Sequence, residues 1–417
     1  MDIIKRLLNF YGSLNIYYRL LPFLLLYSCI CIVFAKNVPV DDEGRYLWFA
    51  TNLLNGFYSP PYPDINLWNG PGYPVLLASL IYLKIPLLGL RLLNAFLLYF
   101  SLVISYKTLN LFSTNRNSFL FTSIIGLYFP IFEVLPQIMT ESLTWFLISL
   151  VIFLFLKNHT HRSISWKLIL LASFSIAYLA MTKVIFGYVI LLMLLISVFV
   201  FVIPKFRQSV IKSTLIFLFS LFFCLPWLIY THSLTEKFFY WTNSAGMSLY
   251  TMSSPYANEL GDWFHTNELQ QNSNHKVFID SISILNSLQR DEAYTLAAIN
   301  NIKEHKKKYL SNWLANVGRL LFSYPFSYEE QTINTFWTII PNMFLIVIIV
   351  FAFAIGIKHR EIFTVGWILL FLFISIYLFG CTFVSAFRRM FYVTVPFWVY
   401  FISYVYSSIV LPKIKQH

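Results

Sequence analysis

Long apolar segments recur along this chain of 417 residues, about ten in all and each about 17–22 residues long, which is the length that a helix needs to cross a bilayer. Hydrophobic residues make up 58% of the chain and charged residues only 12%, against about 45–50% and about 25% in soluble globular domains. Because a soluble protein could not cover so much apolar surface, the sequence predicts an all-α polytopic membrane protein.

The predicted spans start at regular intervals, with two longer gaps that indicate loops. They begin near Leu20, Leu92, Asn117, Glu141, Trp166, Val184, Val210, Phe336, Ile362 and Phe391. The segment before the first span carries three bases, and the apolar run that follows lacks the small residues of a signal-peptide cleavage site. We therefore expect the first apolar run to be a spanning helix.

The basic residues are distributed unevenly between the two predicted sides of the membrane. An even number of spans places both termini on one side, and the loops of that side carry 15 bases and 2 acids, whereas the other side carries 15 bases and 16 acids. Short basic loops stay in the cytoplasm, so both termini are expected there and nearly all acids outside. The net charge of +12 thus reflects topology, and no nucleic-acid partner is expected.

Three regions follow from this topology. We expect an N-terminal membrane module over residues 1–230 with about seven spans, a mostly helical outer domain over 231–335, and a C-terminal membrane module over 336–417 with about three spans. The first outer loop, 36–90, contains an apolar stretch at 75–90 that is too short to span comfortably. Interfacial helices are therefore predicted in this loop.

A group of acids follows the first span and supplies the main catalytic candidates. Asp41, Asp42 and Glu43 precede an amphipathic helical pattern that ends at Gly56. A carboxylate beside a bilayer is costly unless it has a task, so Asp42 is the candidate general base, with Glu43 beside it, whereas Asp41 is expected to cap the helix. Which of the two aspartates is the base stays open. Glu141 is a second candidate for the same cavity, or simply a favourable acid at a helix N-terminus.

Four cations stand at helix ends on the acid-rich side, namely Arg91, Lys183, Arg388 and Arg389. Any one of them can be explained as a side chain that reaches toward lipid headgroups. Together they favour an anionic ligand, because the guanidinium fork matches phosphate oxygens. We predict that these four bind a donor phosphate.

The remaining chemistry is sparse. Tyr46, Tyr73 and Trp241 are candidate contacts for a sugar or an acceptor, although most aromatics are expected in packing and interfacial belts. The four cysteines lie within or beside apolar segments and are expected to be core residues. The histidines have no metal-ligand spacing and no nucleotide-binding loop is present, so no metal and no cofactor are expected.

The order of these motifs resembles that of a known superfamily. Asp42-Glu43 with Tyr46, Ala50, Leu53 and Gly56, followed by Gly70-Pro71-Gly72-Tyr73-Pro74, is similar to the first outer loop of integral-membrane GT-C glycosyltransferases. These include the protein O-mannosyltransferase-like family and the lipid A aminoarabinose transferases. Further similar segments are Arg91-Leu92, Met139 to Leu143, Leu179 to Lys183, Pro226-Trp227 and Arg388-Arg389 with Pro396.

The resemblance implies the GT-C fold and a reaction. A sugar would pass with inversion from a polyprenyl-phosphate donor to an acceptor on the outer face. Asp42 would take the acceptor proton, while Arg388, Arg389 or Lys183 stabilises the leaving phosphate. One departure leaves the donor and acceptor classes open, since the family commonly has Arg-Asn where this chain has Tyr230-Thr231.

Several alternatives remain at this stage. A monosaccharide transferred to a surface glycan or glycolipid of the O-antigen or lipid A type is preferred, in a bacterial inner membrane with a periplasmic active site. A flippase or transporter of lipid-linked sugars is less favoured, because transporters usually place ionisable residues near the bilayer midplane. A polysaccharide polymerase or ligase that uses pyrophosphate-linked donors is a third reading.

Overall fold

The computed structural model describes residues 14–40, 42–160 and 163–410, and all its regular elements in these ranges are helical. Eight helical segments are long and apolar enough to cross a membrane, which confirms the predicted polytopic all-α class. They are α2 (Ile16–Val33), α5 (Leu87–Leu109), α7 (Glu141–Thr160), α9 (Ile185–Val202), α10 (Arg207–Thr235), α16 (Phe336–Lys358), α17 (Val365–Thr382), and α18 (Arg388–Tyr392) with α19 (Val395–Val405).

The predicted spans near Asn117 and Trp166 form shorter helices, α6 (Asn115–Gly126) and α8 (Trp166–Thr182), which are not among the eight. With 12 residues, α6 extends only about 18 Å at 1.5 Å per residue, so this predicted span is shorter than expected. The helix ends where Gly126 packs against α2, and a Cβ there would lie 2.5 Å from the ring of Phe23. The path continues through the 3-10 helix η1 (Phe129–Glu133).

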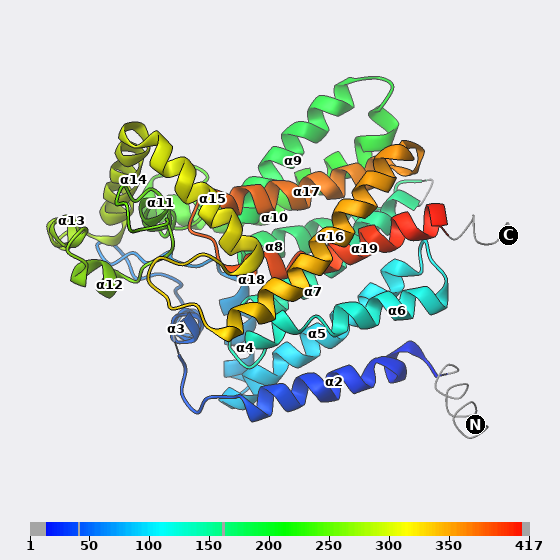
Figure 1. Cartoon of the computed structure of the whole chain (residues 1–417), viewed down its shortest axis with the longest axis horizontal. Coiled ribbons are helices and arrows are strands. Elements are labelled where there is room, and N and C mark those ends of the chain that lie inside the picture. Colours follow the sequence, from blue (N-terminus) through cyan, green and yellow to red (C-terminus); the bar gives the residue numbers. More distant parts are fainter. Residues whose placement is uncertain (1–13, 41, 161–162, 411–417) are drawn as a thin grey trace.

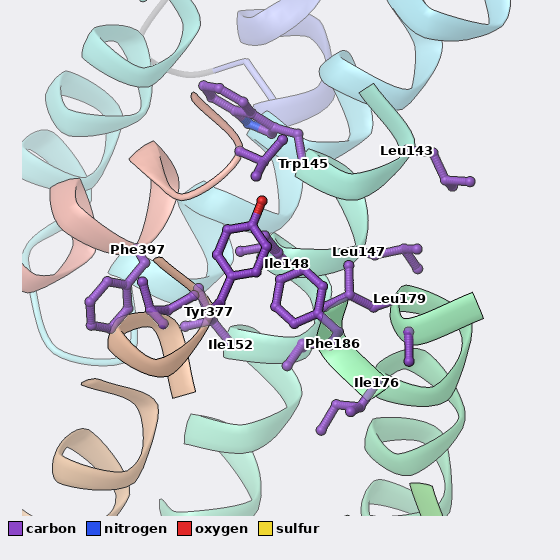
Figure 2. Close-up of a cluster of buried hydrophobic side chains, with 14 of the residues drawn as sticks. Leu143, Trp145, Leu147, Ile148, Ile152, Ile176, Leu179, Phe186, Tyr377 and Phe397 are labelled. Carbon is purple, nitrogen blue, oxygen red and sulfur yellow. The ribbon is translucent and has the colours of Figure 1, made fainter. Parts of the chain in front are cut away.

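The centre of the bundle is a continuous apolar core in which α19 and α7 are the most enclosed of the spans. Figure 2 shows side chains of α7, α8, α9 and α17 meeting there. Phe186 and Tyr377 stack face to face, with ring centroids 4.3 Å apart and an interplanar angle of 2°. The four cysteines are free. Cys31, Cys224 and Cys381 are buried, as predicted, whereas the predicted core position is wrong for Cys29, which is exposed on α2.

The first outer loop forms two short helices at one end of the bundle, α3 (Asp42–Leu54) and α4 (Gly72–Tyr82). Figure 1 shows α3 between the membrane helices and a group of outer helices, while the start of α2 and the end of α19 lie at the opposite end of the bundle. At 11 residues, α4 is too short to span. It begins at Gly72, three residues before the expected interfacial segment.

The outer region has a small apolar core of its own. Five helices belong to it: α11 (Ala245–Met252), α12 (Thr266–Gln271), α13 (Lys276–Ile282), α14 (Ser287–Glu304) and α15 (Lys306–Phe322). A capping box of Asn286 and Gln289 starts α14. The core includes Met247, Tyr250, Leu269 and Tyr294. Because α15 also contacts α16, α17 and α18, this region is packed on the end of the bundle where α3 lies.

Candidate functional site

The start of α3 places Asp42 between two arginines. Its Oδ1 lies 2.5 Å from Nη2 of Arg45, one helical turn ahead, and its Oδ2 lies 3.2 Å from Nη2 of Arg389. The Asp42 side chain is still 21% exposed, so its carboxylate is accessible from outside. A carboxylate at the N-terminus of a helix is also stabilised by the helix dipole.

The two arginines determine the ionisation of Asp42. Burial alone raises the pKa of this carboxyl, but the charges and hydrogen bonds of Arg389 and Arg45 outweigh burial and lower its pKa below the ordinary value. Asp42 is therefore ionised at neutral pH, which is the state that a general base requires.

A second ion pair lies next to this one because α7 and α8 are antiparallel. Glu141 starts α7 and Lys183 follows the end of α8, so both lie at the outer end of the bundle, with Nζ 2.7 Å from Oε1. Nε of Arg389 lies 3.7 Å from the same Oε1. Arg389 thus bridges the two carboxylates. Glu141 is almost fully buried, whereas Lys183 is 17% exposed.

The two neighbouring arginines of α18 point to different partners, because successive helical residues are about 100° apart around the axis. Arg388 pairs with Glu133 of η1, with Nε 2.9 Å from Oε2, and also donates to the hydroxyl of Ser323. It therefore ties α18 to η1 and to the end of α15. Of the two, only Arg389 joins the cluster around Asp42.

The Gly70-Pro71-Gly72 motif explains how the first loop reaches the end of α8. A Cβ on Gly70 would lie 2.2 Å from the carbonyl oxygen of Met181, and one on Gly72 would lie 2.5 Å from the hydroxyl of Thr182. Tyr178 donates a hydrogen bond of 2.7 Å to the carbonyl of Gly72. Only a backbone without side chains can pack this closely, and the contact fixes the loop immediately before Lys183.

Glu43 and Arg91 lie apart from this cluster, although the sequence placed both in the site. They form a buried ion pair with Nη2 3.0 Å from Oε2, and their side chains are 1% and 2% exposed. Glu43 also accepts the backbone N–H groups of Val40 and Ile138, while Arg91 donates to the carbonyl of Lys36. With these partners the pair holds the first loop to α5, which is a structural task.

Two of the three predicted aromatic contacts lie at the cluster. The rings of Tyr46 and Tyr73 meet edge to face at 5.3 Å. The Tyr46 hydroxyl accepts a hydrogen bond from Asn69, whereas the buried Tyr73 hydroxyl has no partner among the described residues. Trp241 is fully buried against Gly187, where a Cβ would lie 2.3 Å from its ring. The structure therefore packs Trp241 in the core.

Two members of the cluster were not predicted, namely Arg45 and Asn69. Nε of Arg45 donates a 2.7 Å hydrogen bond to Oδ1 of Asn69, and Asn69 in turn donates to Tyr46. The spacing of Arg45 three residues after Asp42 was an available signal, since residues three apart in a helix are neighbours. Asn69 precedes the glycine motif and has no comparable signal.

The departure at Tyr230 has a structural counterpart. The Tyr230 hydroxyl accepts the backbone N–H of Ser59 at 3.0 Å, and Trp227 packs edge to face on Tyr58 at 5.0 Å. Tyr230 thus fastens the proline-rich part of the first loop to α10.

The charges of the cluster favour an anionic ligand. Arg45, Lys183 and Arg389 surround Asp42 and Glu141, so one positive charge is in excess. Among the described residues, no group of three or more His, Cys, Asp or Glu side chains could hold a metal ion. Asp41 lies outside the described residues.

Comparisons with known proteins find likenesses among solved structures. No family model matches the sequence, and no curated protein matches it. Among solved structures, the chain is similar to ArnT from Cupriavidus metallidurans bound to undecaprenyl phosphate, at 12% identity and a TM-score of 0.42, over 96% of this chain and 79% of that one. A likeness at this level assigns no function, so the function must be argued from the cluster itself.

Proposed function

We propose that this membrane protein is an inverting glycosyltransferase that moves a monosaccharide from a polyprenyl-phosphate donor to a hydroxyl group of a glycan or glycolipid. The observation that carries the proposal is the position of Asp42. It is an ionised, accessible carboxylate at the mouth of a membrane bundle, in contact with Arg45 and Arg389 and close to the Glu141–Lys183 pair. A base and phosphate-binding cations are thus adjacent where water meets lipid.

The reaction needs one proton acceptor and one stabilised leaving group. The acceptor oxygen attacks the anomeric carbon as the bond from that carbon to the donor phosphate breaks, and the phosphate leaves with the bonding electrons. Asp42 takes the proton of the attacking hydroxyl, a contribution of about 10²–10⁴-fold for general base catalysis. Arg389 and Lys183 stabilise the negative charge that develops on the phosphate.

The ion pairs of the resting site give the donor a way to activate the base. Arg389 has two carboxylate partners, Asp42 and Glu141. When a phosphate takes over part of the Arg389 fork, the pKa of Asp42 rises toward its ordinary value, because a cation that lowers it is shared. The carboxylate thus becomes a stronger base when the donor is present.

Glu141 acts as a positioning residue in this scheme. Its side chain is 1% exposed and forms ion pairs with both Lys183 and Arg389, which fixes the positions of these two cations. Arg388, Glu43 and Arg91 have other partners, as described above, so their effects on turnover are indirect.

The topology supports an outer location for the site. Loops on the termini side carry the excess of bases, which favours a cytoplasmic location for that side. The cluster lies at the opposite end of the bundle, next to α3. We therefore propose a bacterial inner-membrane enzyme whose periplasmic site uses a surface glycan or glycolipid of the O-antigen or lipid A type.

The test uses purified protein in lipid nanodiscs with labelled polyprenyl-phosphate monosaccharides and an extract of outer-membrane glycans. Release of polyprenyl phosphate and labelling of the glycan are followed for the wild type, for Asp42→Asn and for Glu361→Gln. Glu361 is an exposed acid of the 3-10 helix η3 (Arg360–Ile362), between α16 and α17, and serves as the matched control.

The proposal expects release by the wild type and by Glu361→Gln, with a loss of about 10²-fold or more in Asp42→Asn at unchanged thermal stability. Near-normal turnover of Asp42→Asn would remove Asp42 as the base. Absence of release with every donor, from folded protein, would favour a pyrophosphate-linked polymerase or ligase, or a transporter.

A further inference from the structure

A cavity of about 510 Å³ lies between the first outer loop and the outer helices, beside the cluster. One wall is formed by Asp64, Asn66 and Trp68 of the loop, and the other by residues of α11 and α14 and of the turn that precedes α14. Its volume falls in the range of about 300–1,000 Å³ that small-molecule sites occupy. None of the steps above uses this cavity.

The lining is rich in groups that hydrogen-bond to hydroxyls. Asn66, Asn243, Asn286 and Ser287 contribute amides and a hydroxyl, and the half-buried Trp68 contributes an aromatic surface. An aromatic ring together with amide and carboxylate groups suits a saccharide, whose rings have apolar faces and hydroxyl edges.

The charge of the lining distinguishes an acceptor from a donor. Two acids, Asp64 and Asp291, face one base, Arg290, so the cavity has an excess of negative charge. Asp291 is 8% exposed and accepts hydrogen bonds from the backbone N–H of Gly246 and the hydroxyl of Tyr240. This negative charge disfavours binding of the donor phosphate in the cavity, whereas the cation-rich cluster suits that phosphate. The cavity instead favours a neutral or amino sugar.

Trp68 connects the cavity to the catalytic cluster. It lines the cavity, and the guanidinium of Arg45 lies over its ring at 5.5 Å from the centroid. The next residue, Asn69, accepts a hydrogen bond from Arg45. The side chain of Trp68 alone therefore separates a saccharide in the cavity from the ion pair of Arg45 and Asp42.

We propose that this cavity binds the saccharide portion of the acceptor, as a neutral or amino sugar, and presents its terminal hydroxyl to Asp42. The inference rests on the proposed transfer reaction for its role and on the cavity itself for binding. Trp68 then forms the boundary between the acceptor subsite and the charged cluster that holds the donor phosphate.

Cysteine protection tests the binding directly. In a chain carrying Cys29→Ser, which leaves only the three buried cysteines, a single cysteine is placed at Ile284 or at Val277. Ile284 lines the cavity and is 90% exposed, whereas Val277 is 82% exposed on α13 and does not line it. Rates of maleimide modification are measured with maltotriose, mannotriose and the glucosamine trisaccharide as probes.

The expected result is at least a threefold slower modification of Ile284→Cys at a saturating concentration of one trisaccharide, with no change at Val277→Cys. Absence of protection by all three probes, or equal protection at both positions, overturns the proposal. This readout needs no turnover, so it stands apart from any failure of the transfer reaction.

A kinetic arm tests the role in transfer. Modification of Ile284→Cys with a bulky maleimide should raise the KM for the glycan acceptor at least tenfold, leave the KM for the donor within twofold, and have no counterpart in modified Val277→Cys. A donor KM that rises equally would assign the cavity to the donor and contradict the proposal. If a trisaccharide protects Ile284→Cys but the unmodified protein transfers no sugar, the cavity is a saccharide site and the proposed glycosyltransferase function is wrong.

Discussion

Arg389 Nη2 lies 3.2 Å from Asp42 Oδ2, although the two residues are 347 positions apart in the chain. The contact joins the start of the last membrane segment to the helix that follows the first one. Since Nε of Arg389 is also 3.7 Å from Glu141, a single guanidinium connects three distant parts of the fold. The cluster is therefore complete only when the whole bundle has assembled.

The first prediction concerns the pH dependence of turnover. Arg45 and Arg389 lower the pKa of Asp42, so wild-type kcat/KM should stay constant through the neutral range and fall only at acid pH, where the carboxylate becomes protonated. Arg45→Gln removes one of these charges, so the pKa of Asp42 should rise and the acid limb should move to higher pH. The measurement is a pH profile of kcat/KM.

Arg360→Gln is the matched control, because Arg360 is an exposed arginine of η3 at a distance from α3. Its acid limb should coincide with that of the wild type. An acid limb that Arg45→Gln leaves in place, or moves to lower pH, would show that another group governs the profile.

The second prediction concerns the Glu43–Arg91 pair. Removal of either partner leaves a buried charge alone, which typically costs about 3–5 kcal/mol. Glu43→Met and Arg91→Met should each lower the thermal midpoint strongly. The double variant Glu43→Met/Arg91→Met should recover part of the loss, although Val40 and Ile138 still lose an acceptor. A double-mutant cycle of thermal stability in nanodiscs measures this coupling.

If the pair instead takes part in the chemistry, the single variants will keep their stability and lose kcat. That outcome would return Glu43 and Arg91 to the site. Activity per folded molecule separates the two cases.

The third prediction concerns the close contact of the glycine motif. In Gly72→Ala the new methyl group meets Thr182 at 2.5 Å, and overpacking of this kind costs about 1–3 kcal/mol. Because Thr182 precedes Lys183, the shift should also reduce kcat. Gly44→Ala is the control, since no heavy atom lies within 4 Å of its new methyl group and alanine in a helix is favoured by about 0.5–1 kcal/mol.

Thermal midpoints and kcat of both variants are measured side by side. Unchanged kcat in Gly72→Ala would mean that the position of Lys183 does not depend on this contact.

The fourth prediction concerns the hydroxyl of Tyr73, which is buried and has no partner in the described part of the chain. An unsatisfied buried polar group costs about 1–3 kcal/mol, so Tyr73→Phe should be as stable as the wild type or more stable. If the hydroxyl binds the substrate, kcat/KM should nevertheless fall about tenfold, the value of one good hydrogen bond.

Thermal stability and kcat/KM are determined on the same preparation of Tyr73→Phe. A variant that keeps full kcat/KM would exclude contact between this hydroxyl and the substrate, and it would place Tyr73 with the packing residues.

The sequence alone indicated much of the candidate site because several of its residues stand at positions that topology fixes. Glu141 begins one predicted span and Lys183 ends the next, so an antiparallel helix pair must bring both to the same face. Asp42 and Arg389 lie at the outer ends of other spans. The charge asymmetry of the loops placed all four on one side, and the structure brings these four together.

Sequence patterns could not separate residues of like chemistry that have different partners. Arg388 and Arg389 are adjacent and equally basic, and only their directions from α18 assign one to Glu133 and the other to Asp42. Asp42 and Glu43 are likewise adjacent, yet Glu43 faces Arg91 in the interior. The choice depends on which side of a helix faces which neighbour, and that is a property of packing.

What the sequence determined by itself is the polytopic all-α membrane class, because it follows from segment length and hydropathy summed over many residues. What only the tertiary structure decided is the pairing within the cluster, the burial of Trp241 against Gly187, and the cavity beside Trp68. Each depends on contacts between segments that are far apart in the chain. The distances between such segments are set by how the helices pack, and the local sequence does not predict them.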